Sequence, residues 1–272
     1  APQWCPQTST EFQGSMFIFY PPDNPSQAID CTFHGNAALK WEIPYTDGKK
    51  DGWRKDYFES GALKYQAPYE NSKINGVATW YYEGGSLYSQ IPYVNGLIEG
   101  EYVSYYETGQ IEARVPYRSD LKNGTAHWFY STGARMKDIP WVDDLKHGTE
   151  RGYYSSGPLN YEHPYTNGKK NGMTKGYYEN GNRKYESPYV NGKKQGIRYD
   201  YYETGELKKE TPYENDERHG LEILYEINGD ISCETPFQNG DKHGDVKCYD
   251  SNGDLSSCST YDMGTFIGSC MP

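Results

Sequence analysis

Polar and hydrophobic residues alternate along short stretches of the chain, and polar segments rich in glycine and asparagine separate these stretches. In residues 172–195 two such stretches flank the sequence YENG at Tyr178–Gly181, and the sequence TNGKKN at Thr166–Asn171 lies just before the segment. Alternation favours β-strands. Asn-Gly supplies the positive φ that both central residues of a two-residue hairpin turn require. The pattern predicts one β-hairpin here, with a tight turn at YENG and a longer polar loop at TNGKKN.

The hairpin pattern recurs every 24 residues without an insertion. Proline recurs in this step from Pro44 to Pro236, and each proline is followed by an aromatic residue. Three further series keep the same step: loop glycines from Gly52 to Gly268, turn glycines from Gly61 to Gly253, and aromatic residues from Tyr57 to Tyr249. A fixed period of this length is typical of repeat architectures. The prolines are expected near strand ends, where the missing N–H breaks no ladder bond.

These repeats predict an all-β fold: an elongated antiparallel meander of about nine β-hairpins, with a possible tenth. Residues 28–267 are expected to form the repeats, and residues 1–27 an N-terminal cap. Residues 268–272 are expected to be a C-terminal tail held by a disulfide. The lysines of the wide loops vary most between repeats, which suggests that they are the least constrained part of the unit.

The repeat unit G-x4-Y-Y-E-x-G-x-L-K-x-E-x-P-Y-x-N-G-K-K-x resembles the 24-residue variant of the MORN repeat over about residues 28–268. The resemblance implies β-hairpins that form an extended sheet and act as a scaffold for proteins or lipids. Many bacterial members are labelled antitoxin-like, so an immunity protein that neutralises a toxin is a special case of this reading. A repeat fold hosts many roles, so the resemblance implies the fold more strongly than the function.

Six cysteines lie at the two ends of the chain: Cys5, Cys31, Cys233, Cys248, Cys258 and Cys270. None forms a CxxC pair, which argues against a zinc site, and the even count indicates disulfides formed in an oxidising compartment. The chain begins with APQWC, which we interpret as a mature protein after removal of an export signal. We therefore expect a secreted protein, extracellular or periplasmic.

The repeat register suggests how the cysteines pair. If Phe237 pairs with Gly244 across the wide loop, Cys233 lies directly opposite Cys248. In the next repeat Cys258 and Cys270 are one residue out of register. We expect these two disulfides together with Cys5–Cys31; a Cys248–Cys258 bond across the intervening turn is the alternative.

The net charge of −11 disfavours nucleic-acid binding, which requires a basic face, and makes binding to anionic membranes unlikely. Histidines and glutamates recur at repeat positions, so equivalent copies lie about 10 Å or more apart and do not converge on one site. We found no catalytic motif, and expect no enzyme, no cofactor and no metal site. Asn123, in the sequon Asn-Gly-Thr, is a possible N-glycosylation site.

The candidate interaction surface consists of tryptophans in the first half of the chain, at Trp41, Trp53, Trp80, Trp128 and Trp141. Tyrosine and tryptophan are favoured anchors at interfaces, although each tryptophan could equally pack within the sheet. The first hypothesis is a secreted scaffold that binds a protein partner through this aromatic surface. The second is self-association as a structural subunit of an extracellular assembly or filament, and the third is carbohydrate binding.

Overall fold

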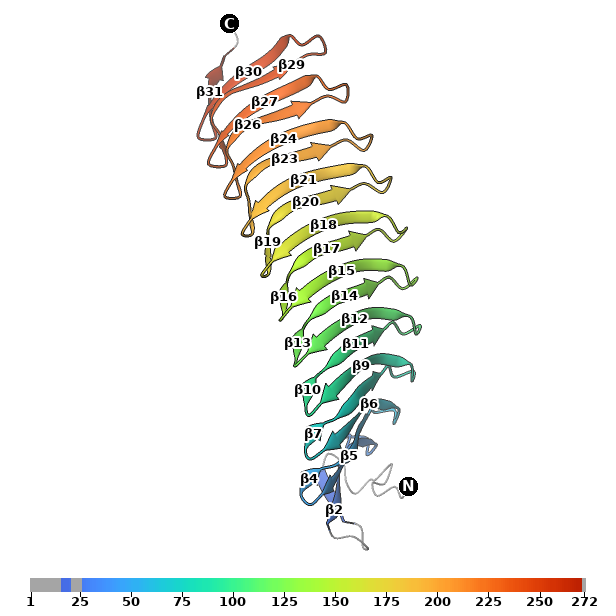
Figure 1. Cartoon of the computed structure of the whole chain (residues 1–272). Coiled ribbons are helices and arrows are strands. Elements are labelled where there is room, and N and C mark those ends of the chain that lie inside the picture. The colour runs from blue at the N-terminus through green and yellow to red at the C-terminus, as the bar shows by residue number, and fades with distance from the viewer. Residues whose placement is uncertain (1–15, 21–25, 271–272) are drawn as a thin grey trace. The chain divides into compact units, whose positions relative to one another are not determined.

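The computed structural model describes residues 16–20 and 26–270, which form β-strands and no helix (Figure 1). No helix that could span a membrane is found among these residues. The chain divides into two compact units, at residues 1–135 and 136–272. In both units antiparallel hairpins follow one another in chain order, so the predicted all-β hairpin meander is confirmed.

Each repeat contains three kinds of strand. The six-residue strands are β5 (Gly52–Tyr57), β8 (Gly76–Tyr81), β11 (Gly100–Tyr105), β14 (Gly124–Phe129), β17 (Gly148–Tyr153), β20 (Gly172–Tyr177), β23 (Gly196–Tyr201), β26 (Gly220–Tyr225) and β29 (Gly244–Tyr249). The eight-residue strands are β3 (Leu39–Thr46), β6 (Leu63–Glu70), β9 (Leu87–Val94), β12 (Ile111–Arg118), β15 (Arg135–Val142), β18 (Leu159–Thr166), β21 (Arg183–Val190), β24 (Leu207–Glu214), β27 (Ile231–Gln238) and β30 (Leu255–Asp262).

The third kind is a two-residue strand just after each eight-residue strand. These are β4 (Lys49–Lys50), β7 (Lys73–Ile74), β10 (Leu97–Ile98), β13 (Leu121–Lys122), β16 (Leu145–Lys146), β19 (Lys169–Lys170), β22 (Lys193–Lys194), β25 (Glu217–Arg218) and β28 (Asp241–Lys242). The chain ends in β31 (Thr265–Ser269), which pairs with β30. At the other end β1 (Met16–Phe19) pairs with β2 (Gln27–Phe33).

The structure exchanges the two predicted connections: the tight turn lies where the longer loop was predicted, and the longer loop lies where the tight turn was predicted. Asn167 and Gly168 both have positive φ, 48° and 79°, and Thr166 pairs with Lys169, so the tight two-residue turn lies within TNGKKN. In the YENG loop only Gly181 has positive φ, at 89°. Its N–H donates to the carbonyl of Tyr178 at 2.9 Å, as in a three-residue loop that ends in a glycine bulge.

The repeated proline and the glycine eight residues later form one structural device. The carbonyl of Pro164 accepts a hydrogen bond from the N–H of Asn171 at 3.0 Å. Gly172 follows with a φ of 110°, and a Cβ atom there would lie 3.2 Å from Cγ of Pro164. The chain thus bends sharply between the two-residue strand and the next six-residue strand, and the proline ring fills the space beside the glycine.

Side chains point alternately to two faces of the sheet. We call the face that carries the residue before each repeat proline the inner face, and the face that carries the proline the outer face. In unit 1 the inner face is closely packed with small or aliphatic residues: Ile43, Ala67, Ala78, Val115 and Ala126 are at most 5% exposed. At the start of the unit Phe33 and Leu39 pack with Cys31 in a small core.

Tyrosine hydroxyls join the strands along the outer face. The repeated tyrosine at the end of each six-residue strand bonds to a polar side chain 15 residues earlier: Tyr57 donates to Glu42 at 2.8 Å, and Tyr177 to Glu162 at 3.1 Å. The position of Tyr57 is Phe129 in one repeat, and the residue 15 positions before it is Arg114 rather than an acceptor. The aromatic residues that recur from Tyr57 to Tyr249 thus lie on one face of the sheet, and most of them have polar partners that the sequence analysis did not predict.

Candidate functional site

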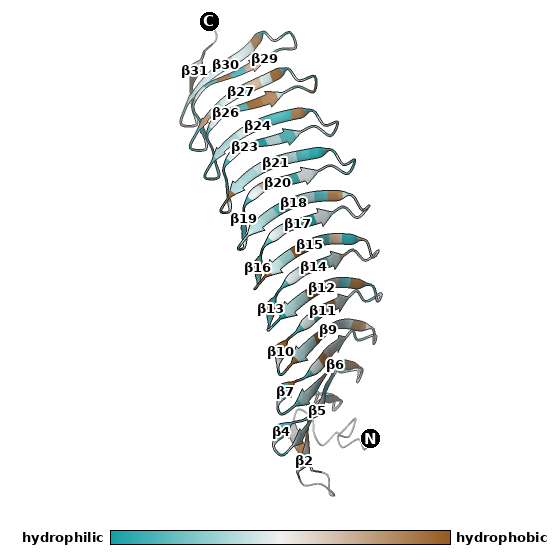
Figure 2. Ribbon diagram, in the orientation of Figure 1, coloured by the Kyte–Doolittle hydropathy of each residue, from teal (hydrophilic) through white to brown (hydrophobic). Residues whose placement is uncertain are grey.

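The inner face changes character in unit 2. At the repeat positions of Ala67 and Ala78, seven successive residues from β17 to β26 are polar or charged, and we call them the inner polar row: Glu150, His163, Thr174, Ser187, Arg198, Thr211 and Glu222. Ile139 before this row and Val246 after it are aliphatic, and Arg54 in unit 1 occupies the position of Arg198. Strands β21, β23 and β24 are correspondingly hydrophilic along most of their length (Figure 2). Buried polar groups are costly unless they are hydrogen-bonded, so the partners of these side chains decide what this face can do.

A connected cluster occupies the first part of this face. The carboxylate of Glu150, which is 7% exposed, accepts hydrogen bonds from Lys146 Nζ at 2.6 Å and from the Tyr161 hydroxyl at 3.0 Å. The Tyr161 ring stacks on the imidazole of His163 with centroids 4.5 Å apart. Nε2 of His163 lies 3.1 Å from the Tyr185 hydroxyl. These bonds hold the side chains against one another.

Burial, and after it the charge of Lys170, lowers the pKa of His163 to about 4. His163 is therefore neutral at pH 7 in the folded state. Burial, together with the neighbouring Glu150 carboxylate, raises the pKa of Tyr161. Both groups keep one protonation state near neutral pH, which suits a packing role within the sheet.

The state of His163 predicts an acid-sensitive unit 2. Because the folded-state pKa lies below the unfolded value of about 6.5, the unfolded chain binds a proton that the folded chain does not, and stability falls as the pH drops from 6.5 toward 4. We expect a loss of about 1–2 kcal/mol, smaller than full burial would give because the ring is partly exposed. Urea unfolding at pH 7, 6, 5 and 4 measures it. The control is His163→Ile, the residue that Ile139 provides at this repeat position, and parallel pH curves for the two proteins would contradict the prediction.

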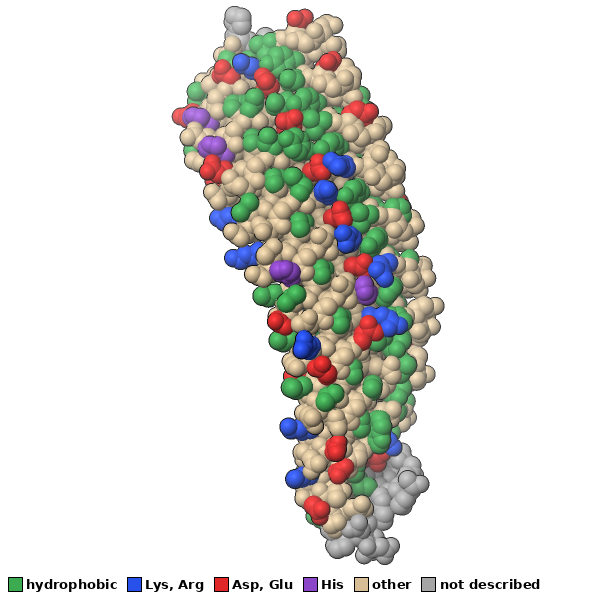
Figure 3. Space-filling model, in the orientation of Figure 1, with side chains coloured by type: hydrophobic (Ala, Val, Ile, Leu, Met, Phe, Trp, Pro, Cys, Tyr) green, Lys and Arg blue, Asp and Glu red, His purple; other side chains and the backbone are tan. Residues whose placement is uncertain are grey.

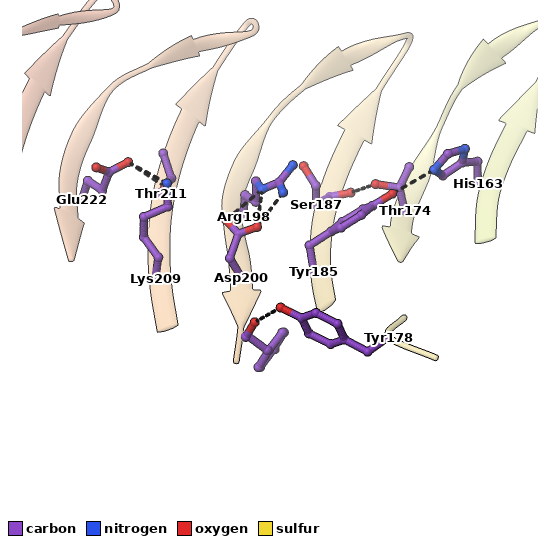
Figure 4. Close-up of polar contacts among 11 residues, drawn as sticks. His163, Thr174, Tyr178, Tyr185, Ser187, Arg198, Asp200, Lys209, Thr211 and Glu222 are labelled. Carbon is purple, nitrogen blue, oxygen red and sulfur yellow. Dashed lines mark hydrogen bonds and ion pairs between the residues drawn. The ribbon is translucent and has the colours of Figure 1, made fainter. Parts of the chain in front are cut away.

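Farther along the inner face two polar side chains are hydrogen-bonded across neighbouring strands, and Arg198 is paired with Asp200 on its own strand β23 (Figure 4). Thr174 donates to the backbone carbonyl of Ser187 at 2.9 Å, and Thr211 donates to Glu222 at 2.8 Å. Arg198 forms a bidentate ion pair with Asp200, at 2.5 Å from Nη2 and 2.9 Å from Nε.

A groove of about 400 Å³ opens on this part of the inner face. Its lining contains four basic side chains and one acidic side chain, together with several tyrosines: Tyr178, Lys184, Tyr185, Arg198, Asp200, Tyr201, Lys208, Lys209 and Tyr213. Figure 4 shows Tyr185 on β21, Arg198 and Asp200 on β23 and Lys209 on β24, with Tyr178 just after the end of β20. The groove is thus a basic, tyrosine-lined surface in a chain whose net charge is −11.

The outer face of unit 2 carries an exposed hydrophobic row. Met173, Ile197 and Leu221 occupy one repeat position in three consecutive repeats and are 41%, 39% and 44% exposed. Each pairs across the hairpin with a repeat proline, Pro188, Pro212 and Pro236 respectively. We call these six residues the outer stripe. In Figure 3 hydrophobic side chains also gather over β26–β30.

The five predicted tryptophans do not form one row. Trp41 and Trp80 lie on the inner face of unit 1, where the Trp80 ring contacts Tyr65 at 4.6 Å and Arg54 lies 5.7 Å from the Trp41 ring. Trp128 occupies the repeat position of Trp80, and Trp141 follows a repeat proline in unit 2. Trp53 is on the outer face and is 48% exposed. Four different repeat positions therefore provide these rings, and only the position of Trp53 is equivalent to the outer stripe.

The cysteines pair as the register suggested. Cys233 is bonded to Cys248, with Cα atoms 4.1 Å apart, and Cys258 to Cys270, with Cα atoms 5.1 Å apart. The assumed pairing of Phe237 with Gly244 is wrong, because Phe237 pairs with Lys242. The bend that follows Lys242 shifts the register by two residues, so Cys233 still lies opposite Cys248. Cys31 is fully buried and disulfide-bonded. Its predicted partner Cys5 lies outside the described residues.

Two other predicted positions lie at the loops. The N–H of Asn123, the possible glycosylation site, donates to the carbonyl of Pro116 at 3.0 Å, and its side chain is partly exposed. His243 is exposed at the equivalent position, with Nδ1 3.2 Å from the Asp262 carboxylate. The sequence prediction missed the inner polar row and the outer stripe. Comparing residues at the same repeat position would have found both.

The family model of the MORN repeat variant matches residues 50–71, 74–95, 98–119, 146–167, 170–191, 194–215 and 242–263, seven segments of 22 residues that total 154 of 272. No curated protein sequence matches the chain significantly. Among solved structures, a porin-like protein from Bacteroides uniformis ATCC 8492 is similar at 8% identity, over 92% of this chain and 91% of that one. Its TM-score is 0.21, too low to carry an argument.

Proposed function

The chain belongs to the MORN repeat variant family, and on this premise we propose that it is a non-catalytic scaffold that binds a protein partner. The observation that carries the proposal is the outer stripe. An exposed strand position in a single-layered sheet is expected to be polar, yet this position of the six-residue strands is apolar and exposed in three consecutive repeats of unit 2. Contiguous exposed apolar surface on a water-soluble domain marks an interaction site.

The geometry of the outer stripe suits a protein surface. Met173, Ile197 and Leu221 recur every two strands, about 9.6 Å apart, and the prolines between them make the stripe continuous. The equivalent position is also apolar and exposed in the first repeats of unit 1, at Trp53 and Val77, 48% and 42% exposed. The disulfides favour an oxidising compartment, extracellular or periplasmic, as the place where the partner is met.

Site-specific photocrosslinking tests the proposal. A photoreactive amino acid at position 197 should capture a distinct protein from the source organism, whereas the same group at Val190, which is 51% exposed but outside the outer stripe, should not. The unlabelled native chain should inhibit this crosslinking by competing for the partner. The variant Met173→Ser/Ile197→Ser/Leu221→Ser should be at least tenfold less effective as a competitor. Equal capture from positions 190 and 197 would contradict the proposal.

A second candidate function, self-association as a structural subunit, is favoured by β31. Within the described residues β31 pairs only with β30, and its Phe266 and Ile267 are 57% and 61% exposed. An open apolar edge is a template for strand addition. Light scattering at rising concentration separates the two functions. A native chain that stays monomeric at millimolar concentration excludes assembly, and loss of oligomers in Phe266→Lys/Ile267→Lys would support it.

A further inference from the structure

The basic groove on the inner face of unit 2 is built from residues that the repeat does not require. Lys184 and Lys208 occupy the same position in consecutive repeats, as do Lys40 and Lys64 in unit 1, but Tyr88, Glu112 and Asn160 occupy it elsewhere. The hairpin therefore forms equally well without a lysine there. Lys209, next to Lys208, also lines the groove.

The cations of the groove are not all neutralised by the protein. Arg198 is paired with Asp200, and Lys209 lies 3.7 Å from the Glu222 carboxylate. Lys184 and Lys208 have no such partner among the described residues: their ammonium groups lie over tyrosine rings, 5.5 Å and 5.3 Å from the centroids of Tyr178 and Tyr202. Two lysines thus remain available to an anionic ligand in a chain of net charge −11.

We propose that this groove binds an acidic peptide segment in extended conformation, with one carboxylate at Lys184 and another at Lys208. Equivalent positions in consecutive repeats are two strand spacings apart, about 9.6 Å. A peptide in the extended polyproline II conformation advances about 3.1 Å per residue and has three residues per turn. Two acidic residues separated by two others therefore point to the same side, about 9.3 Å apart, and match this distance. Lys209 and the Tyr213 hydroxyl provide further polar contacts for the segment between them.

A short acidic segment fits better than a long polyanion. The attraction of Lys184 and Lys208 extends over about a Debye length, roughly 8–10 Å at moderate salt. A nucleic acid or an acidic polysaccharide would continue beyond the groove over a chain that carries 38 acidic and 27 basic side chains, where it would be repelled. The groove and the outer stripe lie on opposite faces of the sheet, so this inference does not depend on the proposed function.

Fluorescence anisotropy of the full chain tests the site. The probe is a fluorescein-labelled glycine–serine octapeptide with glutamates at its third and sixth positions, and a second probe carries the glutamates at adjacent positions. We expect the first probe to bind at least fivefold more tightly in about 50 mM salt. Its affinity should fall as salt is raised, because these contacts are screened.

Matched variants locate the binding. Lys184→Ala/Lys208→Ala should weaken the first probe at least tenfold, and the charge-reversed Lys184→Glu/Lys208→Glu variant should abolish binding. The control is Lys193→Glu, which reverses an exposed lysine of the β21–β22 turn outside the groove lining and should leave affinity within twofold. Equal binding of the two probes, an unchanged affinity in the double variants, or tighter binding of a hyaluronate oligosaccharide or of inorganic phosphate would overturn the proposal.

Discussion

Replacing Gly76 by alanine should destabilise unit 1 by about 2–4 kcal/mol, whereas Gly85→Ala should cost only about 1–2 kcal/mol. Both glycines have positive φ, 121° and 89°, which L-residues rarely adopt. They differ in their surroundings: a Cβ atom on Gly76 would lie 2.8 Å from Cγ of Pro68, while the space around Gly85 is open. The difference between the two variants in urea unfolding therefore measures the contact with proline separately from the backbone strain.

A substitution of Pro68, the residue that the new Cβ atom would contact, provides the control. Pro68→Ala removes the ring atom that the new Cβ would meet, so Gly76→Ala should cost less in the Pro68→Ala background. A double-mutant cycle should give an interaction energy of about 1 kcal/mol or more. Equal costs for Gly76→Ala and Gly85→Ala, with no coupling to Pro68, would contradict the view that proline and glycine form one device.

The contact between the repeat proline and the glycine eight residues later explains why the turn assignment was wrong, although the period and the fold class were predicted correctly. Two Asn-Gly pairs, at Asn167-Gly168 and Asn180-Gly181, flank one strand of the hairpin from which the prediction was made, and both fit a two-residue turn by composition alone. The difference lies in their neighbours: after Gly168 the chain bends against Pro164, while Asn180 and Gly181 end a plain hairpin. Other repeats keep only the glycine at the second site, as in Ser60-Gly61, and this was the available signal.

The sequence of a single repeat does not show that the second loop lysine contacts a tyrosine of the next repeat. The second lysine of the motif reaches the next repeat, where Lys170 lies 5.3 Å from the ring of Tyr189 and Lys194 lies 4.5 Å from that of Tyr213. The prediction that these lysines are the least constrained part of the unit is therefore wrong in unit 2. Contacts between residues 19 positions apart depend on how hairpins stack, which composition and alternation do not specify.

The inner face shows the same limit for the candidate site. Alternation predicts which residues share a face, but not how large and small side chains complement one another across strands. Gly152 and Gly176 leave room for the rings of Tyr161 and Tyr185, since a Cβ atom at either glycine would overlap the ring. Those rings in turn position His163. The sequence contained each of these residues, but their convergence required the register of neighbouring repeats.

The second large effect is expected at the Cys233–Cys248 disulfide. Replacing both cysteines by serine should lower the free energy of unfolding of unit 2 by about 2–3 kcal/mol, because the bond closes a loop across 15 residues and restricts the unfolded chain. In a repeat protein each unit is stabilised mainly by its neighbours. The loss should therefore concentrate in β26, β27, β29 and β30, and hydrogen exchange of these strands measures it.

The Cys258–Cys270 disulfide provides the comparison. It joins β30 to Cys270, the residue after β31, and β31 pairs with no other strand in the described chain. Cys258→Ser/Cys270→Ser should therefore accelerate exchange in β31 while β26 and β27 keep their protection. The bond between Cys233 and Cys248 instead crosses two strands that each have a neighbour on their other side. If both variants give the same exchange pattern, the effect of a disulfide is not confined to its own and the neighbouring repeats. The view that each repeat of unit 2 is stabilised mainly by its neighbours would then be wrong.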